Sequence, residues 1–215
     1  MKRNLLFLLL VLLVLLTSCV SKKAAVAIKY PKKALLASDE LQRWQSFKME
    51  GIAEVQFKMF TFRKNFVLSK NKEALRFDLL DSGIFGFASS NISIYVDSDM
   101  QVYGYLGKKF IEIDDLPESL RDVYTWFNNA DIDDFQTYYD DLFENNSFDK
   151  DGTTFAFTNK MRLKEINNAS NDLRVNIDYD YGDNISNLAI LLNNVKICDL
   201  KIDKISYNNI NVIKP

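Results

Sequence analysis

The sequence predicts a single, mainly β domain in which a meander of antiparallel strands is interrupted near its middle by two helices. Apolar and polar residues alternate with a period of two over many short segments, which is typical of half-buried strands. Turn-forming residues separate these segments. Helical spacing of apolar residues replaces the alternation only near the start and in the middle. The 215 residues contain no internal repeat, and the part that folds has the length of one domain.

The N-terminal segment has the pattern of a signal peptide. Lys2 and Arg3 provide a basic start, and residues 5–16 form an apolar run of about a dozen residues, too short to span a bilayer comfortably. The run ends in Leu16-Thr17-Ser18-Cys19, which resembles the lipobox of bacterial lipoproteins. In that class the cysteine is lipidated and becomes the first residue of the mature chain. The resemblance implies a signal peptide over 1–18 and a lipid anchor on Cys19; the alternative is an uncleaved membrane anchor with an incidental cysteine.

Residues 19–37 are predicted to be the lipidated cysteine and a basic tether. The tether contains lysines and no acidic residue. These lysines either rest on anionic headgroups, at up to about 1 kcal/mol each, or belong to a solvated linker. The cysteine is followed by Val20 rather than aspartate, and the sorting rule of enteric bacteria would send such a lipoprotein to the outer membrane, facing the periplasm. The lysines are Lys22, Lys23, Lys29, Lys32 and Lys33.

The domain itself is expected over residues 38–215. Ser38 offers an N-cap, and Asp39 and Glu40 follow in the first turn, which predicts a short helix to about residue 46. The alternation from 47 to 57 then predicts the first strand. Five further strands are expected over 60–68, 75–79, 92–96, 102–106 and 109–113.

Two helices are predicted in the middle of the chain. Pro117 and Glu118 are typical of a helix start, and Leu120, Val123 and Phe127 supply an apolar stripe. A second helix after Asp131 carries Ile132 and Phe135 on its apolar side and continues to about residue 143. Strands then return, for a total of about eleven or twelve. The returning strands are expected over 154–159, 162–167, 173–181, 188–193, 196–203 and 205–213.

The composition excludes several kinds of chemistry. The chain has no histidine, which removes Ser-His-Asp and Cys-His catalysis and the common zinc sites. A formal net charge of −2 does not indicate nucleic-acid binding. Cys198 lies in an apolar strand pattern and is interpreted as a small core residue rather than a nucleophile. We therefore expect no enzyme activity and no cofactor beyond the covalent lipid.

Two acidic segments could suggest metal binding, but neither is interpreted as a metal site. Residues 147–152 resemble an EF-hand loop, but Ser147 occupies the first ligand position and Thr158 the twelfth, so the segment is predicted to be a turn. The acidic residues between 131 and 144 are predicted to form the solvated face of a helix rather than a divalent-cation site.

The connection between the third and fourth strands is unusually apolar. Ile84, Phe85 and Phe87 stand among glycines that cannot cover them. These side chains either fold back into the core or protrude and contact acyl chains or a membrane, as exposed apolar clusters often do.

The order of elements resembles a known family. A lipobox, a helix, a meander, two central helices and a returning set of strands are similar to the LolA/LolB-like fold and, within it, to the family of outer-membrane lipoprotein receptors. Residues 75–86 resemble that family's strand and its Asn-Pro-Leu-Gly-like loop, whose protruding leucine maps onto Ile84 or Phe85. Leu120-Arg121 with Trp126-Phe127 resembles its Leu-Arg-x-Trp helix, although Asn128-Asn129-Ala130 replaces the Gly-Leu-Pro that follows there.

The resemblance implies both a fold and a function. The fold would be a strongly curved, open antiparallel half-barrel with the central helices covering its mouth. Acyl chains of a lipoprotein, handed over by a periplasmic carrier, would enter an apolar concavity in a monomer. The lid and cavity residues would be Leu120, Val123, Phe127, Ile132 and Phe135, and the Ile84/Phe85 tip would help to release the chains into the bilayer. The alternative is an envelope adaptor of the same fold, with a filled concavity and a protein partner.

Overall fold

The computed structural model describes residues 32–57, 60–81, 89–106, 109–112 and 118–215. By its internal contacts the chain divides into two compact units, Met1–Lys32 and Lys33–Pro215, and the description below concerns the second. The predicted signal peptide and Cys19 lie outside the described residues. Within these residues, no helix combines the length and apolarity that a membrane span needs.

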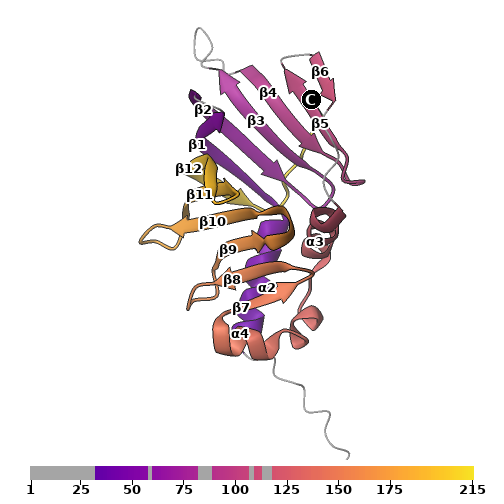
Figure 1. Ribbon diagram of the computed structural model, residues 1–215, viewed down its shortest axis with the longest axis vertical. Coiled ribbons are helices and arrows are strands. Elements are labelled where there is room, and N and C mark those ends of the chain that lie inside the picture. The colour runs from indigo at the N-terminus through magenta and orange to yellow at the C-terminus, as the bar shows by residue number, and fades with distance from the viewer. Residues whose placement is uncertain (1–31, 58–59, 82–88, 107–108, 113–117) are drawn as a thin grey trace, which may run out of the picture. The chain divides into compact units, whose positions relative to one another are not determined.

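The predicted mainly β fold is confirmed, and the described strands number twelve in one antiparallel sheet. The sheet is curved and does not close into a barrel (Figure 1). Each strand pairs with its neighbours in sequence, except that β6 and β7 form the two edges and β1 pairs with β12 in the centre. The first six strands are β1 (Phe47–Phe57), β2 (Phe60–Lys70), β3 (Leu75–Asp81), β4 (Ser89–Val96), β5 (Val102–Leu106) and β6 (Lys109–Glu112). The last six are β7 (Ser147–Lys150), β8 (Thr153–Phe157), β9 (Leu163–Asn168), β10 (Leu173–Tyr179), β11 (Ile185–Leu192) and β12 (Val195–Tyr207).

The first helix, α2 (Lys32–Gln45), begins six residues before the predicted N-cap. Ala34 and Ala37 are buried in the core, and Ser38 is buried inside the helix instead of capping it. The start is favoured because lysine, alanine and leucine are strong helix formers. Residues 32–37, which the sequence placed in the tether, therefore belong to the helix.

The connection from β6 to β7 carries the other helices. The first is α3 (Glu118–Asn129), at the predicted position. The single second helix predicted there is instead a 3₁₀ turn, η2 (Asp133–Gln136), followed by the short helix α4 (Tyr139–Asn145). A further 3₁₀ turn, η3 (Ala169–Asn171), joins β9 to β10.

Two strand predictions were wrong in detail. The segment interpreted as a turn over 147–152 begins with strand β7, and only its Asp151-Gly152 end turns, with both residues at positive φ. The strands expected over 196–203 and 205–213 are one continuous strand, β12, which ends at Tyr207.

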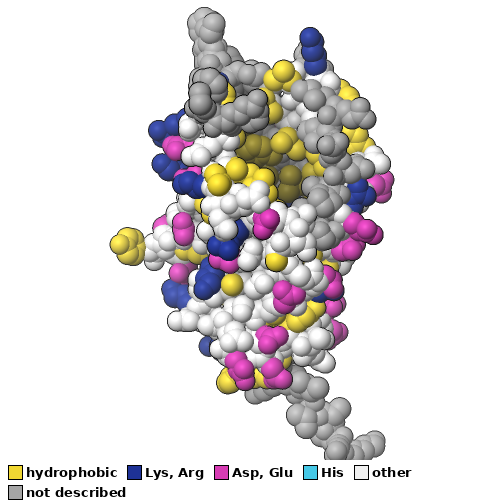
Figure 2. All heavy atoms as spheres, in the orientation of Figure 1, with side chains coloured by type: hydrophobic (Ala, Val, Ile, Leu, Met, Phe, Trp, Pro, Cys, Tyr) yellow, Lys and Arg dark blue, Asp and Glu magenta, His cyan; other side chains and the backbone are white. Residues whose placement is uncertain are grey.

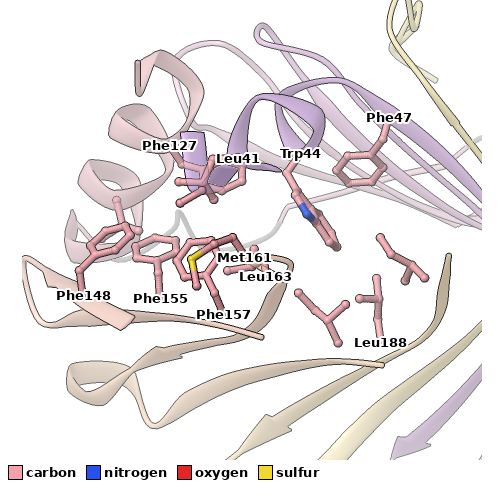
Figure 3. Close-up of a cluster of buried hydrophobic side chains, with 14 of the residues drawn as sticks. Leu41, Trp44, Phe47, Phe127, Phe148, Phe155, Phe157, Met161, Leu163 and Leu188 are labelled. Atoms are coloured by element: carbon pink, nitrogen blue, oxygen red, sulfur yellow. The ribbon is translucent and has the colours of Figure 1, made fainter. Parts of the chain in front are cut away.

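The hydrophobic core lies where the helices cover the sheet. Leu41 and Trp44 of α2 lie among side chains of β8, β9 and the loop between them (Figure 3). Phe148 and Phe155 stack with their ring centroids 5.2 Å apart, and Trp126 of α3 packs against both. This aromatic cluster fixes α2 and α3 on the β7–β9 half of the sheet.

A buried carboxylate links α2 to the sheet. The side chain of Glu40 is only 3% exposed. Its Oε2 lies 2.9 Å from Nε of Arg162, and its Oε1 accepts hydrogen bonds from Trp44 Nε1 (3.0 Å) and the Tyr179 hydroxyl (3.2 Å). Burial, together with the negative charge of Glu40, raises the pKa of the Tyr179 phenol. These bonds satisfy a charge that would otherwise be costly to bury.

Candidate functional site: an apolar cavity on the concave face

One face of the sheet is largely apolar. Side chains alternate between faces along each strand, and the cross-strand pairs Val55–Phe62, Phe66–Leu79 and Ala53–Leu200 place like residues on the same side. On the β7–β10 part of this face the helices complete the core. Phe47, Met49 and Phe66 of β1 and β2 also belong to this core, and the rest of the β1–β4 part is left open.

The open part forms a cavity of about 870 Å³. Strands β1, β2, β3, β4, β11 and β12 supply its walls, and no described helix does. Figure 2 shows the hollow as a recess of hydrophobic side chains on the face drawn. The lining residues are Val55, Gln56, Phe62, Lys64, Leu68, Leu75, Phe77, Leu79, Ile92, Ile94, Ile190, Ile197, Cys198 and Leu200.

The cavity wall includes large apolar side chains that solvent reaches. Phe62 is 47% exposed and Ile92 is 40% exposed. Both lie near the starts of their strands, β2 and β4, so this end of the described cavity wall is the more exposed one. Exposed apolar surface in a concave recess, with few polar groups, is typical of sites for apolar ligands.

Two lining residues carry titratable groups. Lys64 is the one charged residue among the described lining residues and stands opposite Ala53 of β1. Cys198 is half-buried, and burial raises the pKa of its thiol to about 11. At neutral pH the thiol is therefore protonated and weakly nucleophilic.

The predicted lid residues lie mostly in the core. Val123, Phe127 and Phe135 are buried, with Phe127 against Phe155 and Phe135 against Phe148. Ile132 is half-buried just before η2. Leu120 is in α3, and its side chain lies outside the description. None of the four described side chains lines the cavity.

The predicted loop residues Ile84, Phe85 and Phe87 lie outside the described residues. The strands that this connection joins are nevertheless informative. Leu79 of β3 and Ile92 of β4 both line the cavity, so the connection leaves and re-enters the sheet at the open end.

A buried lysine fastens α3 beside the cavity. Lys70 of β2 is 3% exposed, and its Nζ donates to Oδ1 of Asn128 (2.5 Å) and to the Gln45 carbonyl (3.2 Å). The same Nζ lies 5.0 Å from the centre of the Tyr124 ring. Burial lowers the pKa of Lys70 to about 7. Lys70 is two residues from Leu68, so this polar cluster marks the boundary between the helix-covered core and the cavity.

The described residues offer no other obvious chemistry. No group of three or more acidic or cysteine side chains in this part of the chain is placed to hold a metal ion. The acidic residues Asp140, Asp141 and Glu144 are exposed on α4.

Comparison with known proteins gives no name to this site. No protein-family model matches the chain, and no curated protein matches it either.

Proposed function

We propose that this protein is a membrane-anchored lipoprotein that binds acyl chains, or the lipid part of a lipoprotein, in the cavity of an open half-barrel. Its role would resemble that of the LolB-like acceptors in lipoprotein localisation, with Cys19 in the outer membrane and the domain in the periplasm. The observation that carries the proposal is the 870 Å³ apolar cavity. This volume is within the usual range of ligand pockets, about 300–1,000 Å³.

The physical chemistry of such a site is simple. Each methylene moved from water into the cavity contributes about 0.8 kcal/mol, and the cost of ordering the chain offsets part of this gain. Phe62, Phe77 and Ile94 would supply most of the contact. No covalent step and no nucleotide is needed, because the relative affinities of donor and acceptor set the direction of transfer.

The unfilled part of the concave face favours an apolar ligand over the alternative of an adaptor that binds a protein partner. An adaptor would be expected to fill its concavity with side chains. Here α2 and α3 fill the β7–β10 part, where Trp126 and Phe155 pack, and a portion of the β1–β4 part stays uncovered. The helices thus serve as a partial cover that leaves room for a chain.

The test compares two neighbouring leucines of β3. Leu79 lines the cavity, whereas Leu80 is the next residue and points to the opposite face. The protein lacking residues 1–19 would be exported with a cleavable signal and titrated with a fluorescent long-chain fatty acid, and native mass spectrometry would detect co-purified lipid. Leu79→Glu should weaken binding by about tenfold or more, because a carboxylate in the cavity must be desolvated.

Leu80→Glu is the matched control and should bind like the wild type. Circular dichroism would verify that both variants fold. Equal binding by the two variants, or a wild-type protein that neither carries lipid nor binds the fatty acid, would contradict the proposal.

A further inference from the structure

The tether joins the domain at the end that is far from the cavity. Helix α2 begins at Lys32, and Nζ of Lys33 donates to the Phe143 carbonyl (2.9 Å) and to Oδ1 of Asn146 (2.8 Å) at the end of α4. The cavity takes no lining residue from α2 or α4. In Figure 1 α4 and the start of α2 lie at one end of this unit, and the end of β1 and the start of β2 lie toward the other, the hairpin end.

Element lengths show how far apart these ends are. Helix α2 has 14 residues and rises about 21 Å. It leads into β1, whose 11 residues span about 36 Å toward the β1–β2 turn. The hairpin end is therefore up to about 55 Å from Lys32.

The chain between Cys19 and Lys32 is shorter than this distance. Residues 20–31 reach at most about 40 Å even if fully extended. A membrane anchor on Cys19 would therefore keep the α2/α4 end of an upright domain nearer to the bilayer than its hairpin end.

The side chains at the α2/α4 end are of the kinds found at membrane–water interfaces. Leu35 and Leu36 are each 38% exposed and Phe143 is 59% exposed. Lys33 places its ammonium 5.4 Å from the centre of the Phe143 ring. Apolar side chains beside amines are typical of interfacial contacts. The acidic residues of α4 oppose a strong electrostatic attachment, so the tether and this apolar contact set the orientation.

We propose that the α2/α4 end faces the bilayer that holds Cys19, and that the cavity opens away from it, toward the aqueous phase. This inference rests on the lipid anchor of the proposed function. Its consequence is that acyl chains enter the cavity from a partner in the aqueous phase, one that carries them in an apolar site of its own. Direct uptake from the anchoring bilayer is not the route. The connection between β3 and β4 is then at the membrane-distal end.

Depth-dependent quenching tests the orientation on the full, lipidated protein. In a Cys198→Ser background, a bimane fluorophore would be attached to Leu36→Cys or to Val195→Cys. Both positions are exposed and apolar. Leu36 is on α2, and Val195 begins β12 at the hairpin end, close to the β1–β2 turn. The proteins would be reconstituted into phosphatidylethanolamine–phosphatidylglycerol vesicles in which some headgroups carry a nitroxide.

Quenching at Leu36→Cys should exceed quenching at Val195→Cys several-fold. Inserting about twenty Gly/Ser residues after Ala25 should reduce this difference, because a longer tether lets the domain turn. Equal or stronger quenching at Val195→Cys in vesicle-bound protein would overturn the orientation alone. Failure of the protein to float with the vesicles would overturn both the anchor and the orientation that depends on it.

Discussion

Gly51 of β1 faces Lys201 of β12 so closely that a side chain at position 51 would overlap the Lys201 carbonyl oxygen. The two strands are the first and last in sequence, and their pairing in the centre of the sheet joins its two halves. An irregularity in the register lies at this point, between Glu50 and Gly51. The absence of a Cβ therefore permits the central pairing of the fold.

Replacement of Gly51 should be strongly destabilising. Gly51→Ala is expected to lower the free energy of unfolding by about 2–3 kcal/mol, because backbone atoms of β12 must move to admit the methyl group. Urea denaturation followed by fluorescence would measure the loss. Gly182→Ala is the matched control, since a Cβ there meets only flexible side chains of Asn184 and Asp180. Equal midpoints for the two variants would show that β1 and β12 have room to separate.

Removal of the Glu40 charge should destabilise the junction of α2 with the sheet. Glu40→Gln leaves the Arg162 guanidinium without its buried partner, and a loss of about 3 kcal/mol is expected. The double variant Glu40→Gln/Arg162→Met should recover part of this loss, because no unpaired charge remains. Chemical denaturation of the single and double variants forms the measurement. The explanation would be contradicted if the double variant lost more free energy of unfolding than the two single variants lose together.

Lys70 should make stability rise with pH above neutrality. Its pKa is about 7 in the folded protein against 10.5 ordinarily, so between these values the unfolded chain binds more protons. The free energy of unfolding then increases with pH, by up to about 1.4 kcal/mol per unit. Below about pH 7 both states are protonated, and the folded protein bears the cost of the buried charge. Unfolding curves between about pH 7 and 9 would measure the slope.

Lys70→Met should abolish most of this slope, whereas Lys72→Met, at an exposed neighbouring position, should largely keep it. The comparison is of slopes because Lys70→Met also removes the hydrogen bond to Asn128. A wild type and a Lys70→Met variant with the same slope would show that Lys70 keeps an ordinary pKa.

The thiol of Cys198 should report on occupation of the cavity. Its raised pKa of about 11 predicts slow reaction with iodoacetamide near neutral pH, and a rate that increases with pH. Bound fatty acid should slow the reaction further, because Cys198 lines the cavity. Mass spectrometry of the alkylated protein would follow the rate.

A cysteine at the exposed position 36, in a Cys198→Ser background, provides the control and should react quickly with or without fatty acid. Protection at both positions would indicate aggregation with the fatty acid instead of binding in the cavity.

Period-two alternation predicted β1 to β6 with bounds that differ by at most three residues, because one face of these strands is apolar and the other polar. The same rule divided β12 into two strands for a physical reason. The extra residue Asp203 at the register shift moves the inward positions from Leu200 and Ile202 to Ile205 and Tyr207. The alternation thus changes phase within one strand. Strand β7 was missed because it is a short edge strand with one apolar residue, Phe148.

The apolar inner surface of the candidate site could be predicted, but its extent could not. The apolar stripe with Val123 and Phe127 predicts that α3 buries one side. It does not indicate against which part of the sheet that side packs. That choice is fixed by contacts distant in sequence, such as Gln45 with the Phe127 carbonyl and Lys70 with Asn128. The start of α2 was missed because small alanines make the buried face of its first turn.

The pairing of β1 with β12 also sets the order in which the fold can be completed. Apart from the pairing of β1 with β12, strands β1 to β6 pair with near neighbours in sequence, as do β7 to β12, so each half of the sheet is built from local contacts. The contact between β1 and β12 closes a loop of almost the whole domain and is expected to form late. Until β12 has been synthesised, β1 keeps an unpaired edge beside the apolar cavity wall. A chain in this condition is prone to aggregate and is a natural client of chaperones.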